Sequence, residues 1–439
     1  MIPSLASQPT QTERRENRPL FALFGANAIS YIGDFLTLLA IPWFVLQTTG
    51  SVTKTGFAAF FSTLPMIISA FFGGALVDRL GYKYASILSD LTSGVSVALI
   101  PLLYATVGLA FWQLLTLVFF AGLLQAPGAT ARSAMIPDLV ARTQIPLERA
   151  NAVSDGIRRV SGFIGAPLAG VLIAFTGTSN LLWLDALSFF LSAALVGLGV
   201  TGLAIATPSA VTRKKGARAY VADLWDGLRF IRHTPLILAI MLTVTITNML
   251  DQAHFAVVYP VYVRTFFGSA IVLGVLVAAF GGAAFAGTII FGIVGPRLPR
   301  RLTFGVCFIL LSLRFGVMAL VPPLFVLIIT NVFTGLAAGP LNPILSTVEQ
   351  EQVPQEMRAR VFGVITAGAF LGSPFGAFAG GYLVQWAGIQ PTLLILGVCY
   401  LLTTASLLFN PALRSMEKPE GTIGQNISAD GGAQKHEYA

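Results

Sequence analysis

The chain has 439 residues, of which 55% are hydrophobic and only 10% are charged, and its formal net charge is +8. A water-soluble protein of this length would need far more charge to cover its surface, so the composition excludes an ordinary soluble domain and indicates a lipid bilayer as the solvent. The positive charge could indicate nucleic-acid binding, but basic residues in short loops between apolar segments are the usual topology signal of a membrane protein.

Twelve apolar segments are long enough to cross a bilayer, since about 20 helical residues span roughly 30 Å of hydrocarbon. Lipid offers the backbone no hydrogen bonds, so each segment is predicted to be a helix, and the alternation typical of a membrane barrel is missing. The predicted spans are 20–46, 55–78, 85–107, 111–136, 152–176 and 180–203, then 236–264, 270–294, 302–320, 323–347, 359–386 and 390–409.

Polar stretches divide the chain into five predicted parts. An N-terminal tail (1–19) and a C-terminal tail (413–439) are expected to lie in the cytoplasm, without fixed structure at 1–17 and 415–439. Between the tails lie two six-helix halves, 20–203 and 236–412, joined by a cytoplasmic linker at 204–235.

The linker contains an apolar stripe at helical spacing, which predicts a short amphipathic helix lying on the cytoplasmic leaflet. An ordinary solvated helix is the alternative. The stripe consists of Val221, Leu224, Trp225, Leu228 and Ile231.

Lysine and arginine gather in alternate loops, which predicts a multi-pass protein of the bacterial inner membrane with both termini in the cytoplasm. The opposite loops offer only Lys54 and Arg264. The residues assigned to the cytoplasmic loops are Arg14, Arg15, Arg18, Arg79, Lys83, Arg132, Arg142, Arg149, Arg213, Lys214, Lys215, Arg218, Arg229, Arg232, Arg297, Arg300, Arg301, Arg358, Arg360, Arg414 and Lys418.

Neither a metal site nor a cofactor is expected from the sequence. Cys307 and Cys399 both fall within apolar spans, where they are interpreted as small buried hydrophobic residues. A Walker motif is also missing, which argues against an ATP-driven pump.

An internal repeat relates the two halves at offsets of 207 to 218 residues. Two six-helix halves in parallel repeat are one of the known transporter plans, with the substrate site near the midplane. The matches are GALVDRLGYK (74–83) with GIVGPRLPRR (292–301), FAGLLQAPGA (120–129) with FTGLAAGPLN (333–342), SGFIGAPLAG (161–170) with AFLGSPFGAF (368–377), and Asp34 with Asp251.

The segment between the second and third spans, GGALVDRLGYK, resembles the signature of the major facilitator superfamily. Tyr82 stands where the family often has a basic residue. The resemblance implies an all-α membrane fold of twelve helices in two pseudo-symmetric halves, and a motif that locks the cytoplasmic side while the cavity opens outward. Setting the topology is the alternative role for Asp78 and Arg79. The predicted gating residues are Gly74, Asp78, Arg79, Gly81, Lys83 and, from the next basic stretch, Arg132.

The fifth span carries GFIGAPLAG, which is similar to the motif associated with antiporters. Gly162, Pro167 and Gly170 match it, whereas Ala166 and Val171 replace two of its glycines. A kinked helix with a small-residue face could also serve packing alone.

Three further segments resemble the macrolide-efflux and enterobactin-exporter branch of the superfamily: RSAMIPDLV (132–140), ERANAVSD (148–155) and LDALSFF (184–190). This resemblance implies proton-coupled export of small amphipathic compounds by alternating access. One departure concerns the fourth span, where Gln125 is present but Gly122 fills the position of the family's arginine. Arg132, predicted at the helix end, does not replace it.

Asp34 and Asp251 are acids inside the first and seventh spans, which line the cavity if the resemblance holds. An ionisable group near the midplane costs roughly 2.5–3.5 kcal/mol on insertion scales, so it should be functional, paired or in contact with water. We expect Asp34 to be the primary proton-coupling or cation-contacting acid and Asp251 its partner, with Gln252 and His254 nearby. A structural hydrogen bond is the alternative for each.

Three other charged residues within the predicted spans have no assigned functional role. Arg314, in the ninth span, is predicted to pair with an acid or to extend towards an interface. Asp185 and Asp90, near the starts of the sixth and third spans, are expected to cap a helix or to pair.

The sequence therefore predicts a monomeric transporter whose partners are a small-molecule substrate, protons and the bilayer. Import of a metabolite by a symporter or uniporter is the alternative within the same fold. A membrane-embedded enzyme would need a catalytic cluster at membrane depth. The chain has three histidines, and only His254 lies inside a predicted span, so this class is disfavoured. A channel is disfavoured by the gating motif.

Overall fold

The structure, a computed structural model, describes residues 17–201 and 217–417. The predicted tails (apart from their innermost residues) and the first part of the linker lie outside the described residues. The side chains of residues 70–76, 78, 163, 166, 217–224, 296 and 359 are also outside the description.

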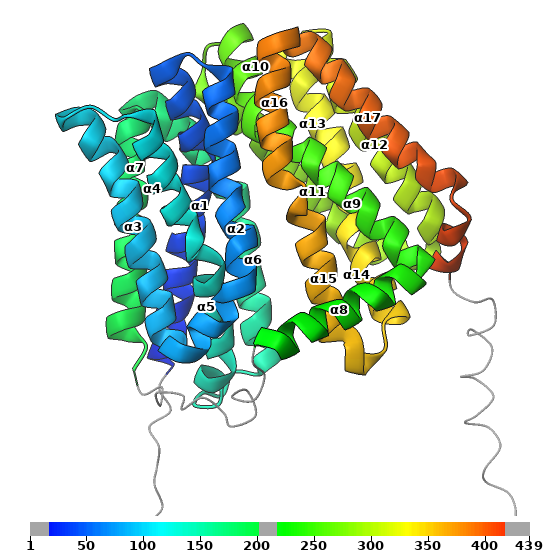
Figure 1. The fold of residues 1–439 in the computed structure, drawn as a ribbon, viewed down its shortest axis with the longest axis horizontal. Coiled ribbons are helices and arrows are strands. Elements are labelled where there is room, and N and C mark those ends of the chain that lie inside the picture. The colour runs from blue at the N-terminus through cyan, green and yellow to red at the C-terminus, as the bar shows by residue number, and fades with distance from the viewer. Residues whose placement is uncertain (1–16, 202–216, 418–439) are drawn as a thin grey trace, which may run out of the picture. The chain divides into compact units, whose positions relative to one another are not determined.

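All regular elements in the described ranges are helical, and the helices follow the predicted spans closely (Figure 1). In the first half they are α1 (Arg18–Thr49), α2 (Val52–Leu80), α3 (Tyr82–Thr106), α4 (Phe111–Leu123), α5 (Gln125–Val140), α6 (Leu147–Thr176), α7 (Thr178–Ala194) and the π-turn η1 (Leu195–Gly199).

The second half starts after α8 (Ala217–His233), which lies in the predicted linker. It consists of α9 (Pro235–Ala253), the π-turn η3 (His254–Val258), α10 (Tyr259–Phe266), α11 (Ala270–Val294), η4 (Gly295–Arg297), α12 (Arg300–Ala319), α13 (Leu324–Ala338), α14 (Leu341–Gln352), η5 (Gln355–Met357), α15 (Arg358–Leu371), α16 (Ser373–Ala387), α17 (Ile389–Phe409) and η6 (Pro411–Met416).

Ten helices among the described residues are long and apolar enough to cross a membrane, and the bent pair within α6 makes an eleventh. The 29-residue α2 occupies the place of the remaining predicted span. Several spans are interrupted where glycine and proline occur: at Leu124 before Pro127, at Gly339 and Pro340, and at Gly372 before Pro374. Proline removes a backbone donor and clashes with the preceding turn, which favours these breaks, although Pro42, Pro65 and Pro101 lie inside continuous helices.

Contacts between residues group the chain into two units. The first unit comprises Met1–Thr37, Ile68–Gly165 and Ser179–Arg213. Its apolar core includes Leu23, Met135, Leu139 and Val196, from α1, α5 and η1.

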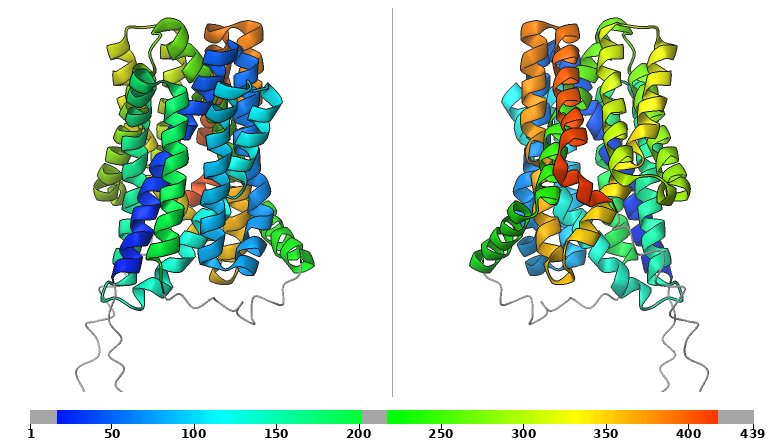
Figure 2. Two further views of the ribbon diagram at one scale, coloured as in Figure 1. Left: turned by 90° about the vertical axis from the view of Figure 1, so that its left-hand side faces the viewer. Right: turned by 90° about the vertical axis from the view of Figure 1, so that its right-hand side faces the viewer.

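The second unit comprises Leu38–Ile67, Ala166–Thr178 and Lys214–Ala439. It therefore contains the end of α1, the start of α2 and the end of α6 together with all helices from α8 onward. The neighbouring helices α16 and α17, coloured orange and red in Figure 2, belong to it.

The predicted linker helix exists as α8, which packs across α9 and α15 in the second unit (Figure 1). Ile231 is buried in this contact, whereas Trp225 and Leu228 remain exposed. Asp226 pairs with Arg360 of α15 at 3.5 Å. Exposed apolar side chains on one face are the pattern of a helix in a membrane interface, so the interfacial position remains our prediction for α8.

Candidate functional site

Asp34 of α1 is the most accessible of the buried acids in the first unit. Its carboxylate accepts a hydrogen bond of 2.6 Å from Nε2 of Gln125, the first residue of α5. Gln125 is exposed and Asp34 is partly exposed. The break at Leu124 starts a new helix at Gln125, so the amide lies where the two helix segments meet and reaches across to α1.

A closed ion pair lies within the same unit. Arg132 Nη1 of α5 donates to Asp90 Oδ1 of α3 at 2.9 Å, and both side chains are at most 3% exposed. Ser192 of α7 donates to the other Asp90 oxygen at 2.7 Å, and Arg132 Nη2 donates to Ser30 of α1 at 3.3 Å. Three helices are thus joined to α5 through this pair.

The pair corrects the prediction that Arg132 lies in a loop at the helix end. The helix α5 continues to Val140, so Arg132 lies in its interior and is 2% exposed. The prediction was wrong because it assumed that an arginine at this point of the sequence lies in a cytoplasmic loop. Asp90 compensates the charge, which lets the helix continue past it, and the expected pairing of Asp90 is confirmed.

Asp185 of α7 is fully buried, and its hydrogen-bond partners in the described structure are hydroxyl groups. Thr37 donates to one carboxylate oxygen, and Ser188 donates to the other at 3.4 Å. Asp185 lies two turns inside α7, so it joins α1 to α7 instead of capping a helix.

Gly33 is the point at which α1 comes closest to this carboxylate. A Cβ atom at Gly33 would lie 2.2 Å from Ser188 Oγ and 2.5 Å from Asp185 Oδ1, closer than real contacts allow. Only a residue without a side chain permits this approach.

Gly33→Ala is therefore expected to destabilise the protein by roughly 1–3 kcal/mol, the usual cost of overpacking. The measurement is the unfolding midpoint of the purified protein in detergent. Gly316→Ala in α12 is the matched control, because a Cβ there meets no atom within 4 Å. Equal midpoints for the two variants would contradict the close packing of α1 on α7.

The antiporter-like motif of α6 contacts the neighbour of Asp34. Cβ atoms at Gly162 and Gly165 would lie 2.9 Å and 2.7 Å from the side chain of Phe35, so both glycines make room for this ring. At the other end of the motif, a Cβ at Gly170 would lie 2.9 Å from the Cα of Gly274 in α11. Pro167 lies inside α6 between these contacts.

A second glycine pair lies in the second unit, where α2 meets α16. A Cβ at Gly56 would lie 3.0 Å from the Cα of Gly381. The guanidinium of Arg264 donates to the Leu46 carbonyl near the end of α1, in the same unit. Backbone meets backbone at both glycine pairs, as is common between membrane helices.

In the second unit, Asp251 of α9 forms an ion pair with Arg314 of α12. Arg314 is 2% exposed, whereas the Asp251 side chain is 29% exposed. Four aromatic rings surround the guanidinium, and their centroids lie 4.8 to 5.8 Å from its central carbon. The rings are those of Phe255, Phe280, Phe315 and Tyr400. Of the two roles predicted for Arg314, pairing with an acid and extending towards an interface, the structure shows the first.

His254 lies deeper than the exposed face of Asp251. It is 1% exposed and stacks on the ring of Tyr259, whose hydroxyl donates to Asn331 at 3.0 Å. Gln252, next to Asp251, is partly buried. The structure therefore places Asp251 and Arg314 together, with His254 in the aromatic packing behind them.

The predicted gating motif can be followed only in part. The side chains of Gly74 and Asp78 lie outside the described residues, and Arg79 is exposed in the last turn of α2. Gly81 has a φ of 77°, which glycine adopts without strain. Lys83 Nζ donates to the carbonyls of Gly197 and Val200 at 2.8 and 2.7 Å, so it caps the end of η1. This role of Lys83 was missed in the sequence.

In the described ranges, no three His, Cys, Asp or Glu side chains lie close enough together to hold a metal ion. The acids described above lie inside membrane-spanning helices, and in each unit one buried arginine lies among them. This arginine is Arg132 in the first unit and Arg314 in the second. Asp34 and Asp251 are the partly exposed members of these two groups.

Comparison with known proteins gives a consistent result over nearly the whole chain. The family described as "transmembrane secretion effector" matches residues 17–428. The multidrug efflux pump Tap of Mycolicibacterium fortuitum is 30% identical over 402 residues, covering 91% of this chain and 97% of the pump. The enterobactin exporter EntS of Citrobacter koseri is 28% identical over 372 residues, covering 82% and 84%. The nucleoside transporter NupG has a similar fold, with a TM-score of 0.71, 12% identity and coverage of 89% and 98%.

Proposed function

Because the chain belongs to the transmembrane secretion effector family of the major facilitator superfamily, we propose that it exports small amphipathic compounds in exchange for protons. The names of its relatives support the direction and the cargo: a multidrug efflux pump and an exporter of enterobactin. The observation that carries the proton coupling is Asp34, a carboxylate that is partly exposed, accepts a bond from Gln125 and lies in a membrane-spanning helix.

The chemistry of Asp34 suits a proton carrier. Moving a carboxylate from water into apolar surroundings disfavours its charged form, so a small change in its environment changes its proton affinity. Arg132 is bonded to Asp90 and Ser30 and is closed off from solvent, so it does not hold Asp34 in the charged form through a direct bond. The Asp34 carboxylate is free to take up a proton when one side of the membrane has access to it and to release it at the other.

Asp251 has a different role in this proposal. Its side chain is paired with Arg314 and still 29% exposed, so in this proposal it is the acid that a cationic or neutral polar cargo contacts. Asp34 is thus the coupling acid, and Asp251 and Gln252 contribute to the cargo site. His254 is buried behind them and positions Tyr259.

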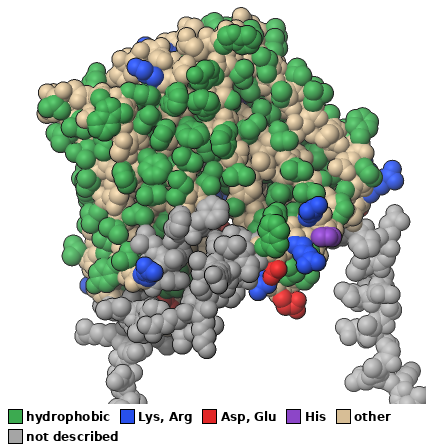
Figure 3. All heavy atoms as spheres, viewed as in Figure 1, with side chains coloured by type: hydrophobic (Ala, Val, Ile, Leu, Met, Phe, Trp, Pro, Cys, Tyr) green, Lys and Arg blue, Asp and Glu red, His purple; other side chains and the backbone are tan. Residues whose placement is uncertain are grey.

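Location follows from the basic loops. We place the protein in the bacterial inner membrane as a monomer, with both termini and α8 on the cytoplasmic side, because Lys and Arg gather in the loops at that end. Apolar side chains cover the surface over α9 and α17, which we expect to face lipid, and charged side chains gather around α8 (Figure 3).

Efflux from pump-deficient bacteria tests this function. Cells that produce the protein are expected to accumulate several-fold less of at least one compound from a panel of fluorescent dyes and macrolides, and a protonophore should abolish the difference. Cells that carry the empty vector give the background accumulation. Export that persists with the protonophore would remove proton coupling. Well-expressed protein that exports nothing, but takes up a metabolite, would replace export with import.

A further inference from the structure

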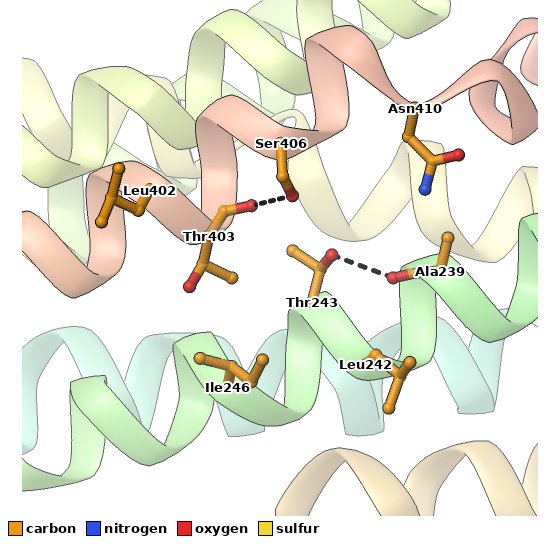
Figure 4. Close-up of a pocket in the computed structure, with 8 residues that line it drawn as sticks. All are labelled: Ala239, Leu242, Thr243, Ile246, Leu402, Thr403, Ser406 and Asn410. Carbon is orange, nitrogen blue, oxygen red and sulfur yellow. Dashed lines mark hydrogen bonds between the residues drawn. The ribbon is translucent and has the colours of Figure 1, made fainter.

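A lateral pocket of about 420 Å³ lies between α9 and α17 in the second unit (Figure 4). At one end of the pocket Ile246 of α9 lies opposite Leu402 of α17, and Leu242 lines the α9 side nearer the other end. At the other end Asn410 lies opposite Ala239, close to the point where α9 follows α8. The pocket therefore extends along the two helices. Thr243 and Ser406 line its middle, and the end marked by Asn410 is called its polar end.

Asn410 directs a hydrogen-bond donor into the polar end. Its side-chain oxygen accepts from the Ala412 N–H at 3.0 Å, which caps the short helix η6. The oxygen is thus engaged, and Figure 4 shows the amide nitrogen turned into the pocket. The hydroxyls of Thr243 and Thr403 donate to carbonyls of their own helices, which leaves them as acceptors only. The polar end is arranged to donate through Asn410.

Exposed basic residues flank the same end of the pocket in the sequence. Arg414 is exposed, one turn beyond Asn410 in η6, and η6 packs on α9 and α12. Arg232 and His233 are exposed at the end of α8, directly before α9 begins. The nearby acid Glu417 accepts hydrogen bonds from the backbone N–H groups of Arg300 and Arg301. Its carboxylate is therefore held at the start of α12.

From this arrangement we infer that the pocket binds one anionic glycerophospholipid of the adjacent leaflet. The lipid phosphate accepts from the amide of Asn410 and interacts with Arg414 and Arg232. One acyl chain lies along Leu242, Ile246 and Leu402. Basic pockets between helices at the membrane surface recognise anionic headgroups in this way, because charge and depth both match a phospholipid. This inference concerns the lateral surface and does not depend on the proposed export.

Native mass spectrometry of the full-length protein tests this inference, after equilibration with mixed micelles of phosphatidylglycerol and phosphatidylcholine. Wild type is expected to retain one phosphatidylglycerol about 10-fold more than phosphatidylcholine, a preference typical of a few ionic contacts. Arg232→Gln combined with Arg414→Gln should lose this preference. The matched control is Arg297→Gln, which removes an exposed charge from η4 and should retain it.

Substitutions that fill the pocket provide a second, independent test. Thr403→Phe places a ring in the pocket and should abolish retention, whereas Leu401→Phe, on the exposed neighbouring face of α17, should not. Asn410→Leu should weaken retention without adding bulk. Equal retention of the two lipids by wild type, or unchanged retention in Thr403→Phe and Asn410→Leu, would overturn the proposal. Displacement by soluble glycerol phosphate at equal concentration would replace the lipid with a phosphate ion.

Discussion

Asp34→Asn is expected to reduce proton-driven export to the level of cells that lack the protein, without loss of folded protein. Asparagine keeps the size of the side chain, and its amide oxygen can still accept from Gln125, so the contact between α1 and α5 remains. What disappears is the group that can exchange a proton. The direct measurement is dye efflux from proteoliposomes with an imposed pH gradient, together with the proton release that the dye induces.

Asp138→Asn is the matched control for this change. Asp138 is an exposed acid on α5, the helix that carries Gln125, and its replacement should leave both signals unchanged. Asp34→Glu should keep part of the export, because the carboxyl group is retained. If Asp34→Asn exports as well as wild type with the same pH dependence, the coupling acid lies elsewhere, and Asp185 would be the next candidate because its partners are hydroxyls.

Removing Asp90 is expected to produce the largest loss of stability. Asp90→Leu should lower the free energy of unfolding by about 3–5 kcal/mol, because it leaves the Arg132 guanidinium buried without its anionic partner. The double variant Asp90→Leu with Arg132→Met should recover most of this loss, since no charge is then left without a partner. Chemical unfolding in detergent micelles measures both effects as a double-mutant cycle.

The exposed pair of Asp155 and Arg158 provides the comparison. These side chains lie 3.5 Å apart and are more than half exposed, so Asp155→Leu should change stability little. A double variant as unstable as the sum of the two single variants would show that Asp90 and Arg132 do not stabilise each other. Arg132 would then contribute through Ser30 and packing alone.

The sequence was sufficient for the all-helical membrane fold and for the family, and both are confirmed. The apolar spans are long and charged loops mark their limits. Each span can therefore be recognised from the length and hydrophobicity of its own residues. The helix breaks near Pro127, Pro340 and Pro374 were not predicted, since each span was expected to be continuous and other prolines, such as Pro42, lie inside unbroken helices.

The arrangement of the charged groups could not be predicted in the same way. Arg132 and Asp90 are 42 residues apart, and Arg314 and Asp251 are 63 residues apart, so each pair depends on which helices pack together. All four residues were singled out from the sequence, yet their partners were not. The general rule that an intramembrane charge must be paired was correct for Arg314. For Arg132 it was not applied, because the residue was assigned to a loop.

The glycine pairs of the second unit also have a consequence for rates. Where Gly56 meets Gly381 and Gly170 meets Gly274, backbone atoms make the closest approach, although the rings of Phe57 and Phe378 pack beside the first pair. Side chains in an ordinary helix contact lose rotamer freedom when they pack, and they must find their packed rotamers again at every new encounter. Contacts between glycines avoid this search. We therefore expect these four glycines to reduce the entropic cost of rejoining their helices, whereas the phenylalanine rings beside the first pair must still find their packed rotamers.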